Sequence, residues 1–288
     1  MDTLNKKISE YYDKSHPIYK YFWYNEENLA MHYGLWDSKT SNRSEALINT
    51  NRVMANIAKI KENEVVLDAG CEVGGSSIWL AKNLKTRNVG ISISKIHIQT
   101  AKSFVSKFGL DDKVKFYLMN FTKTRFSPES FDVVWATESM CHASSKFEFV
   151  SEANRVLKKG GRLIVCDAFL TKNNYTEDDR RMIDEFCEGF VVPNVETKKR
   201  FIEYLRKKKF KNIKFFNMTR NVLPSAKIIH DRCKIALPIA KILVALGIYP
   251  KVIEKTAVAG IRAYELIKKK AGVYGIFYAE KGLSANLV

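Results

Sequence analysis

The stretch Leu67-Asp68-Ala69-Gly70-Cys71-Glu72-Val73-Gly74-Gly75 decides the fold of this 288-residue chain. An apolar run ends in an acid and passes directly into a glycine-rich turn, as the first strand and turn of an open α/β sheet do. Ligands of such sheets lie at the carboxyl ends of the strands, so this turn predicts a binding site. Its unusual feature is Glu72, a second carboxylate within the turn.

The residues of the turn exclude the common phosphate-binding loops. A dinucleotide fingerprint needs glycine at the position of Glu72, because the backbone there approaches a pyrophosphate that a carboxylate would repel. A Walker-type loop needs Gly-Lys-Ser/Thr, which does not follow. Two acids favour a cationic nucleoside without phosphates, and S-adenosylmethionine, with its ammonium and sulfonium groups, is such a ligand. Glu72 either faces that ammonium or points to solvent, and we expect solvent.

Short β-rich runs alternate with helical patterns after residue 63, which predicts βαβ units. The expected fold is α/β, with a Rossmann-like seven-stranded, mostly parallel sheet, helices on both faces, a helical N-terminal lid and helical cap insertions. The expected strands are 64–70, 88–94, 113–120, 131–137, 161–168, 212–219 and 274–282, the last as an antiparallel edge. The helix that begins near residue 146 should end on Gly160-Gly161.

The whole chain, 1–288, is expected to form one domain. Residues 1–62 form the lid, and their segment 11–36 is dense in aromatic residues: Tyr11, Tyr12, Tyr19, Tyr21, Phe22, Trp23, Tyr24, Tyr33 and Trp36. Residues 63–170 form the ligand-binding βαβ core, 171–273 the cap insertions with the sixth strand, and 274–288 the terminal strand.

The net charge of +17 lies in the C-terminal third. Residues 197–288 contain 21 Lys and Arg against 5 Asp and Glu. This asymmetry indicates nucleic acid, an anionic membrane surface or an acidic substrate as partner, or simply a solvated lysine-rich face. The apolar run 235–249 is too short to span a bilayer. It either dips into a membrane interface, lines an acceptor pocket, or forms a buried cap helix, which we favour slightly.

Cysteine usage and the polar first residues bear on compartment and metal content. The five cysteines lie far apart without Cys-x-x-Cys pairs or histidines at ligand spacing, so we expect reduced thiols and no metal. The opening residues lack an apolar signal region, which favours the cytoplasm, with peripheral membrane contact through the basic third. The sequence does not indicate an oligomeric state.

In this turn and in two later motifs, the chain resembles the class I S-adenosylmethionine-dependent methyltransferases. Their first motif reads VLDxGCGxGG, and 65–75 matches it except at Glu72. The stretches SFDVVWA and RVLKKGGRLIV follow at the family's distances. The resemblance covers about residues 10–170 and the terminal strand. It implies a bound S-adenosylmethionine as methyl donor.

The resemblance also implies donor-binding residues. Asp68 would organise the turn, Gly70 and Cys71 would present backbone to the methionine moiety, and Gly74 completes the turn. Asn120 and Phe121 stand where the family grips adenine, the first through a side-chain oxygen. VGISISKIHIQ resembles the GITLSxxQ of sterol, tocopherol and cyclopropane-type enzymes, which points to Ser92 and Ile93. His97 replaces that glutamine, with Gln99 as its alternative and a surface histidine as the plain interpretation.

The acceptor side follows the fourth strand. WATESMCHA, residues 135–143, resembles the sterol 24-C-methyltransferase stretch AIEATCHAP, which implies roles for Glu138 and His142. An unpaired structural role for Glu138 is disfavoured because burial of a lone carboxylate is costly, and the motif match favours a functional role over an ion pair with a nearby Lys or Arg. His142 suits a base near neutral pH or a packed structural histidine. AMHYGLWD resembles the tocopherol-type HMHHGFYD, on which Tyr33 would close over the donor.

The reaction implied is direct methyl transfer to a small, lipophilic acceptor, isoprenoid- or sterol-like and methylated at carbon. N-methylation of a small amine or alkaloid is the alternative. A nucleic-acid acceptor is disfavoured because the Asn/Asp-Pro-Pro-Tyr/Phe motif is missing. A donor-binding protein without catalysis remains a further alternative, supported by the departures at Glu72, His97 and Asn120.

Overall fold

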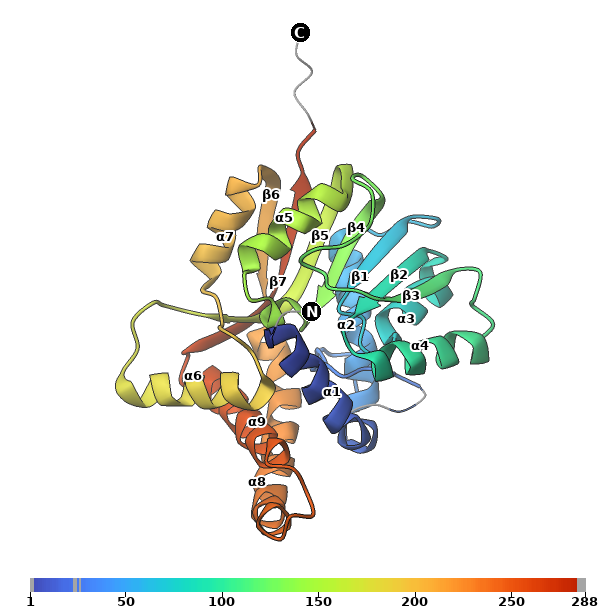
Figure 1. The fold of residues 1–288 in the computed structure, drawn as a ribbon. Helices are drawn as coiled ribbons and strands as arrows, with labels where there is room; N and C mark the ends of the chain where they lie inside the picture. The colour runs from blue at the N-terminus through green and yellow to red at the C-terminus, as the bar shows by residue number, and fades with distance from the viewer. Residues whose placement is uncertain (1–2, 23–24, 26, 284–288) are drawn as a thin grey trace.

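A computed structural model describes residues 3–22, 25 and 27–283, and over these the strands form one seven-stranded sheet (Figure 1). The strand order is β3-β2-β1-β4-β5-β7-β6. The first five strands run parallel, and β7 runs antiparallel to both β5 and β6. The strands are β1 (Val65–Ala69), β2 (Arg87–Ser92), β3 (Val114–Leu118), β4 (Phe131–Thr137), β5 (Leu157–Leu170), β6 (Phe210–Asn217) and β7 (Gly272–Lys281). The predicted fold class is confirmed.

The prediction that the terminal strand lies at the edge of the sheet is wrong, because β6 occupies that edge. β7 lies between β5 and β6, and its middle residues, 274–279, are all buried. The edge strand β6 exposes Lys211 and carries Lys214. Lysines on an edge strand oppose further strand pairing, which accounts for the order of the two strands.

Helices cover both faces of the sheet. One face carries α2 (Arg43–Ala58), α3 (Gly75–Leu84), α4 (Lys95–Lys107) and the first turns of α8 (Thr219–Ala245), and the other carries α5 (Lys146–Val156) and α7 (Lys198–Lys207). Side-chain caps start α2, α4, α5 and α7: Asn42, Ser94, Ser145 and Thr197 each accept a hydrogen bond from the backbone amide three residues on. The buried side chains between helices and sheet form the core.

The helix α5 ends earlier than the sequence predicts. It stops at Val156, and Leu157 already pairs with Phe131 of β4. Gly160, with φ of 72°, lies inside β5, where the register shifts between Leu157 and Arg162. The glycine pair therefore serves an irregular strand start instead of the predicted helix end.

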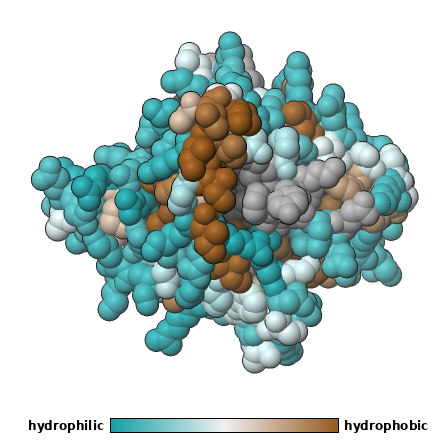
Figure 2. Space-filling view, turned by 90° about the horizontal axis from the view of Figure 1, so that it is seen from below, coloured by the Kyte–Doolittle hydropathy of each residue, from teal (hydrophilic) through white to brown (hydrophobic). Residues whose placement is uncertain are grey.

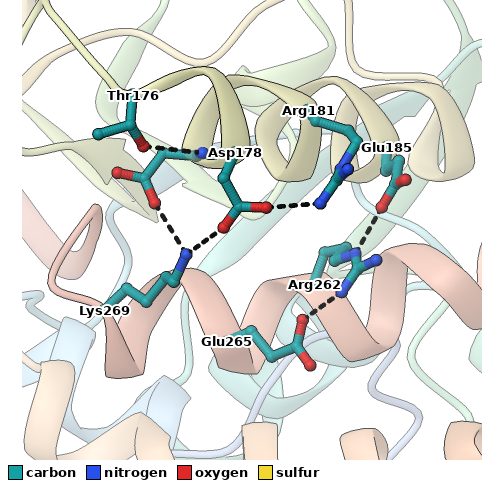
Figure 3. Close-up of polar contacts among 8 residues, drawn as sticks. Thr176, Asp178, Arg181, Glu185, Arg262, Glu265 and Lys269 are labelled. Carbon is teal, nitrogen blue, oxygen red and sulfur yellow. Dashed lines mark hydrogen bonds and ion pairs between the residues drawn. The ribbon is translucent and has the colours of Figure 1, made fainter.

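The cap consists of α6 (Glu177–Phe190), the outer part of α8, and α9 (Val252–Lys268), which lie beyond the carboxyl end of the sheet (Figure 1). Ion pairs join α6 to α9: Arg262 pairs with Glu185, and Lys269 with Asp178 and Asp179 (Figure 3). The segment predicted as cap also contains α7, whose Phe201 and Leu205 are fully buried against the sheet. Only part of the predicted cap segment, 171–273, therefore lies in the cap.

The N-terminal segment forms α1 (Thr3–Phe22), which lies across the carboxyl end of the sheet near α4 and α9 (Figure 1). Hydrogen bonds dock it beside β2 and α4: Ser9 Oγ donates to the Ile93 carbonyl at 3.0 Å, and Ser94 Oγ donates to Asp13 Oδ1 at 2.6 Å. Trp23 and Tyr24 of the predicted aromatic lid lie outside the described residues, as do the side chains of Tyr19, Tyr21 and Phe22.

Candidate active site

A pocket of about 630 Å³, its open mouth included, lies at the carboxyl ends of β1, β2 and β4. The strand order reverses beside β1, which pairs with β2 on one side and β4 on the other, so this is where open α/β sheets bind ligands. Six of the predicted donor-binding residues line the pocket: Gly70, Ser92, Ile93, His97, Asn120 and Phe121. We call it the donor pocket.

The glycine-rich turn forms the back wall of this pocket. Asp68 is buried and its Oδ2 accepts a hydrogen bond of 2.7 Å from Ser77 Oγ, so it ties the strand to α3; burial raises its pKa to about 6. The amides of Gly70 and Cys71 both donate to the Ile91 carbonyl at 3.0 Å. These two amides are therefore committed to β2, while Gly70 still lines the pocket. Asp68, Cys71 and Gly74 lie behind the lining residues.

Gly70 is required by its surroundings. Its φ is 94°, and a Cβ there would lie 2.3 Å from Ser139 Cβ, a residue whose Oγ donates to the Ala69 carbonyl. The first turn and the loop after β4 are therefore in direct contact. Because these two loops meet, groups that follow β4 face the same pocket as the glycine-rich turn.

His97 is buried, which corrects the interpretation as a surface histidine. It is 2% exposed, and burial lowers its pKa to about 3, so its ring is neutral at pH 7. Its Nε2 has no hydrogen-bond partner among the described residues, and the ring lines the donor pocket. An unsatisfied buried ring nitrogen suits a ligand hydroxyl, such as those of ribose. The alternative, Gln99, faces solvent.

Asn120 lies at the predicted place but is engaged differently. Its Oδ1 accepts hydrogen bonds from the backbone amide and the hydroxyl of Thr122, at 2.8 Å and 2.9 Å. This oxygen therefore has no capacity left for an adenine amino group, contrary to the expectation. Phe121 packs edge-on against Phe149 and offers an apolar surface beside Asn120.

Glu72 points to the lid segment, so the expectation that it faces solvent is wrong. Its Oε2 accepts a 2.9 Å hydrogen bond from the Met31 amide, and burial raises its pKa well above the usual range. The side chain also lines the donor pocket. Its φ of 50° is in the left-handed region that favours glycine, which explains why glycine is usual there. Glu72 thus latches the lid to the turn at some backbone cost.

Replacement of Glu72 by glycine should separate these two effects. Relief of the left-handed backbone is worth about 1 kcal/mol, and loss of the Met31 hydrogen bond costs a similar amount, so we expect a nearly unchanged free energy of unfolding. Hydrogen exchange of the Met31 amide should become at least about tenfold faster, because its partner is gone. Exchange mass spectrometry and urea unfolding measure both quantities.

Glu129→Gly is the matched control, since Glu129 has a similar φ of 58° but an exposed side chain. It should stabilise the protein without changing exchange at Met31. Equal exchange at Met31 in the wild type and in Glu72→Gly would show that Glu72 is no latch.

Glu138 lies beside Glu72 at the junction of two cavities. Its Oε1 accepts hydrogen bonds from the Tyr33 amide at 2.8 Å and from Tyr274 Oη at 2.6 Å. Among the described residues no lysine or arginine pairs with it, which removes the ion-pair interpretation. Burial raises its pKa to about 8. Both hydrogen bonds go to Oε1, so Oε2 remains for a ligand.

His142 forms a dyad with Tyr12. Its Nε2 lies 2.7 Å from Tyr12 Oη, and its Nδ1 lies 3.3 Å from the Val191 carbonyl. Because a carbonyl only accepts, we assign the ring proton to Nδ1, which leaves Nε2 to accept from the tyrosine hydroxyl. Burial lowers the His142 pKa to about 4, so the ring is neutral at pH 7. Tyr12 lines both cavities, as does His142.

The second cavity holds about 970 Å³, its open mouth included, and is predominantly apolar. We call it the acceptor cavity. Tyr33 lines this cavity, with its backbone fixed by Glu138, and does not line the donor pocket. Other walls come from the cap and the terminal strand: Ile183, Phe186, Phe190, Val192, Val195, Ala263, Leu266, Ile267, Val273 and Tyr274. Tyr12, Asp167 and Tyr274 are site residues that sequence reasoning missed.

Known proteins match both the motif region and the fold. A methyltransferase domain family matches residues 67–165. A 27-O-demethylrifamycin SV methyltransferase of Amycolatopsis mediterranei is 31% identical over 187 residues, which cover 65% of this chain and 67% of that protein. A sterol 24-C-methyltransferase of Pneumocystis carinii is 34% identical over 169 residues, or 59% of this chain and 43% of that protein.

Among solved structures, the geranyl diphosphate C-methyltransferase of Streptomyces coelicolor A3(2) superimposes with a TM-score of 0.74 at 16% identity, covering 97% of this chain and 98% of that one. At this identity the likeness shows a shared fold. The 31% identical relative, the methyltransferase domain match and the shared fold together show that this chain belongs to the class I S-adenosylmethionine-dependent methyltransferases that act on small molecules.

Proposed function

We propose that this protein transfers a methyl group from S-adenosylmethionine to a carbon of a small lipophilic acceptor, isoprenoid- or sterol-like. One observation carries the proposal: the donor pocket and the acceptor cavity share Tyr12, Glu72, Glu138 and His142. A ligand in the first cavity therefore meets a ligand in the second at four titratable side chains. The larger cavity is mostly apolar, which suits a lipophilic acceptor.

The residues present fit the donor. His97 Nε2 lacks a hydrogen-bond partner among the described residues, and a ribose hydroxyl would supply one. Burial raises the pKa of Glu72 and of Glu138, and a bound cation would favour the ionised, negative form of both. When bound, the donor would supply the methyl group of its sulfonium, and the remainder of the donor would leave as a neutral thioether. The chain aligns the two ligands, and the lid and the walls of α6 and α9 exclude water. Glu138 Oε2, which accepts neither the Tyr33 nor the Tyr274 hydrogen bond, is a position that could take a proton lost by the acceptor.

N-methylation of an amine is a second candidate, favoured by a specific observation. Two carboxyl groups, Glu72 and Glu138, line the acceptor cavity at its junction with the donor pocket, and carboxylates bind ammonium groups. Carbon methylation is supported by the sterol 24-C-methyltransferase relative and by the apolar walls, which provide no further charged partner at the cap end of the cavity.

The place of action that we propose is the cytoplasm, peripherally at an anionic membrane surface. The C-terminal third holds almost all of the net positive charge, and a lipophilic acceptor is found in a bilayer. Within the described residues, no helix is both long and apolar enough to cross a membrane. Peripheral contact is therefore the form of membrane association that fits.

A methyl-transfer assay tests the proposal. The purified chain is given S-adenosylmethionine with a labelled methyl group and, separately, lipid and amine extracts, and the products are identified by mass spectrometry. We expect label on carbon in a lipid product. Label on nitrogen would favour the second candidate. Calorimetry with the donor and its demethylated product accompanies the assay, and binding of both without any labelled product would support a donor-binding protein without catalysis.

A further inference from the structure

The hairpin of α8 and α9 has a buried base and an exposed tip. At the base, Val222, Ala226 and Ile229 of α8 are buried against the body of the protein. The two helices pack along each other and extend away from the sheet, so that the tip, residues 235–253, is the farthest part of the cap (Figure 1). The apolar segment 235–249 therefore lies on the surface of the protein. The favoured expectation that it forms a buried helix of the cap is wrong.

Large apolar side chains cover this tip. Ile235, Ile239, Ile242 and Leu246 recur at helical spacing and are 75%, 59%, 60% and 67% exposed, and Ile248 and Tyr249 continue the surface around the turn. Figure 2, which views the molecule from the tip side, shows a continuous hydrophobic band. Isolated exposed apolar residues are ordinary, but a contiguous band of this kind marks an interaction surface.

The charges around the band favour an anionic surface. From Arg232 to Ile253 the sequence contains no acid, while Arg232, Lys234, Lys241 and Lys251 are basic. A second copy of this chain would bring these basic groups together, and like charges at an interface are unfavourable. A bilayer with anionic phospholipids accepts isoleucine and leucine among its acyl chains and basic groups among its phosphates.

We propose that the α8–α9 tip inserts into the headgroup region of an anionic phospholipid bilayer and anchors the protein there. The band supplies the apolar contact, and the basic residues supply the charge attraction. Binding of such a surface strengthens with both the apolar area buried and the attraction to anionic lipids.

The anchor is rigidly connected to the acceptor cavity. Ala263, Leu266 and Ile267 of α9 line that cavity, and Ala263 lies 11 residues after Val252, the first residue of α9, which is about 17 Å of helix. Ion pairs of Arg262 with Glu185 and of Lys269 with Asp178 join α9 to α6 (Figure 3). Phe186 and Phe190 of α6 form another wall of the cavity. An inserted tip therefore holds the acceptor cavity close to the bilayer. Entry of the acceptor from the bilayer rests on the proposed function; the anchor itself does not.

Co-sedimentation of the full chain with vesicles tests the anchor, using phosphatidylcholine alone or mixed with phosphatidylglycerol. We expect binding to the mixed vesicles that weakens at high salt. Leu246→Glu should reduce this binding at least about tenfold, because an apolar contact is lost and a negative charge is gained. Lys241→Gln should reduce it about fivefold, on the anionic vesicles only.

Leu283→Glu is the matched control, because Leu283 is 78% exposed and follows β7, which ends on the side of the sheet away from the α8–α9 tip (Figure 1). It should bind as the wild type does. The anchor is wrong if the wild type does not bind anionic vesicles at low salt, or if both leucine variants bind equally. Dimerisation in sedimentation velocity that Leu246→Glu abolishes, without vesicle binding, would replace it by self-association. Calorimetry checks that Leu246→Glu is folded, because a folded variant still binds the donor. The vesicle-binding results do not depend on whether the protein transfers methyl groups.

Discussion

Glu138→Gln should lower kcat at least about a hundredfold. It should weaken donor binding by no more than about tenfold, because it removes one of the two acids that attract the cation. The amide is isosteric and keeps an oxygen that accepts from the Tyr33 amide and Tyr274 Oη, so the loop and the lid stay in place. It cannot accept a proton. Single-turnover transfer of labelled methyl measures the effect on chemistry, and calorimetry measures donor affinity.

The pH dependence of the wild type should report the same group. Burial raises the pKa of Glu138 to about 8, and a base acts in its ionised form, which gains population as pH rises through that value. We therefore expect kcat/KM to rise with pH and level off above about 8, since this ratio reports the free enzyme. A bound cation favours the carboxylate, so the rise in kcat should lie at lower pH. The Gln variant should lose both rises.

Glu148→Gln serves as the control, because Glu148 is exposed in the first turn of α5, near the site but outside both cavities. It should behave as the wild type in turnover and pH dependence. Full activity in Glu138→Gln, with an unchanged pH profile, would remove Glu138 from the chemistry and leave it as a support for Tyr33.

The fold could be predicted from the sequence because each part of it has a local signal. The apolar runs that form β1 to β5 alternate with helices of ordinary period, and serine caps mark α4 and α5. The order of β6 and β7 could not be predicted, because it depends on which of the two strands has a neighbouring strand on each side. The end of α5 was missed for a similar reason: Leu157 pairs with Phe131, a contact that no local pattern records.

The donor pocket was predictable and the acceptor cavity was not. Gly70, Ser92 and Asn120 lie at or just after the ends of three strands, and parallel strands bring their carboxyl ends together. The acceptor cavity instead combines Tyr12 of α1, Phe186 of α6 and Tyr274 of β7, which are far apart in sequence. The outward face of 235–249 was missed because composition does not tell a buried apolar helix from an exposed one.

Lys146→Met should destabilise the protein by about 3 kcal/mol and lower turnover at least about tenfold. Lys146 is 2% exposed, and burial lowers its pKa. Its Nζ donates to the carbonyls of Cys141, Ala143 and Asn194 at 2.7, 2.8 and 2.8 Å. Methionine has a similar length but donates nothing, so three carbonyls lose their partner. Urea unfolding measures the stability, and the transfer assay measures turnover.

The expected loss of turnover follows from where those carbonyls lie. Cys141 and Ala143 flank His142, and Asn194 follows Val192 in the segment that walls the acceptor cavity, so Lys146 holds the histidine loop against that wall. Lys158→Met is the matched control, since Lys158 is 44% exposed and pairs with Asp132 at the surface, where the cost should stay within about 1 kcal/mol. If Lys146 supports only stability, its variant should regain full kcat under conditions where it is folded. If it positions His142, kcat should stay low in the folded variant while the donor still binds.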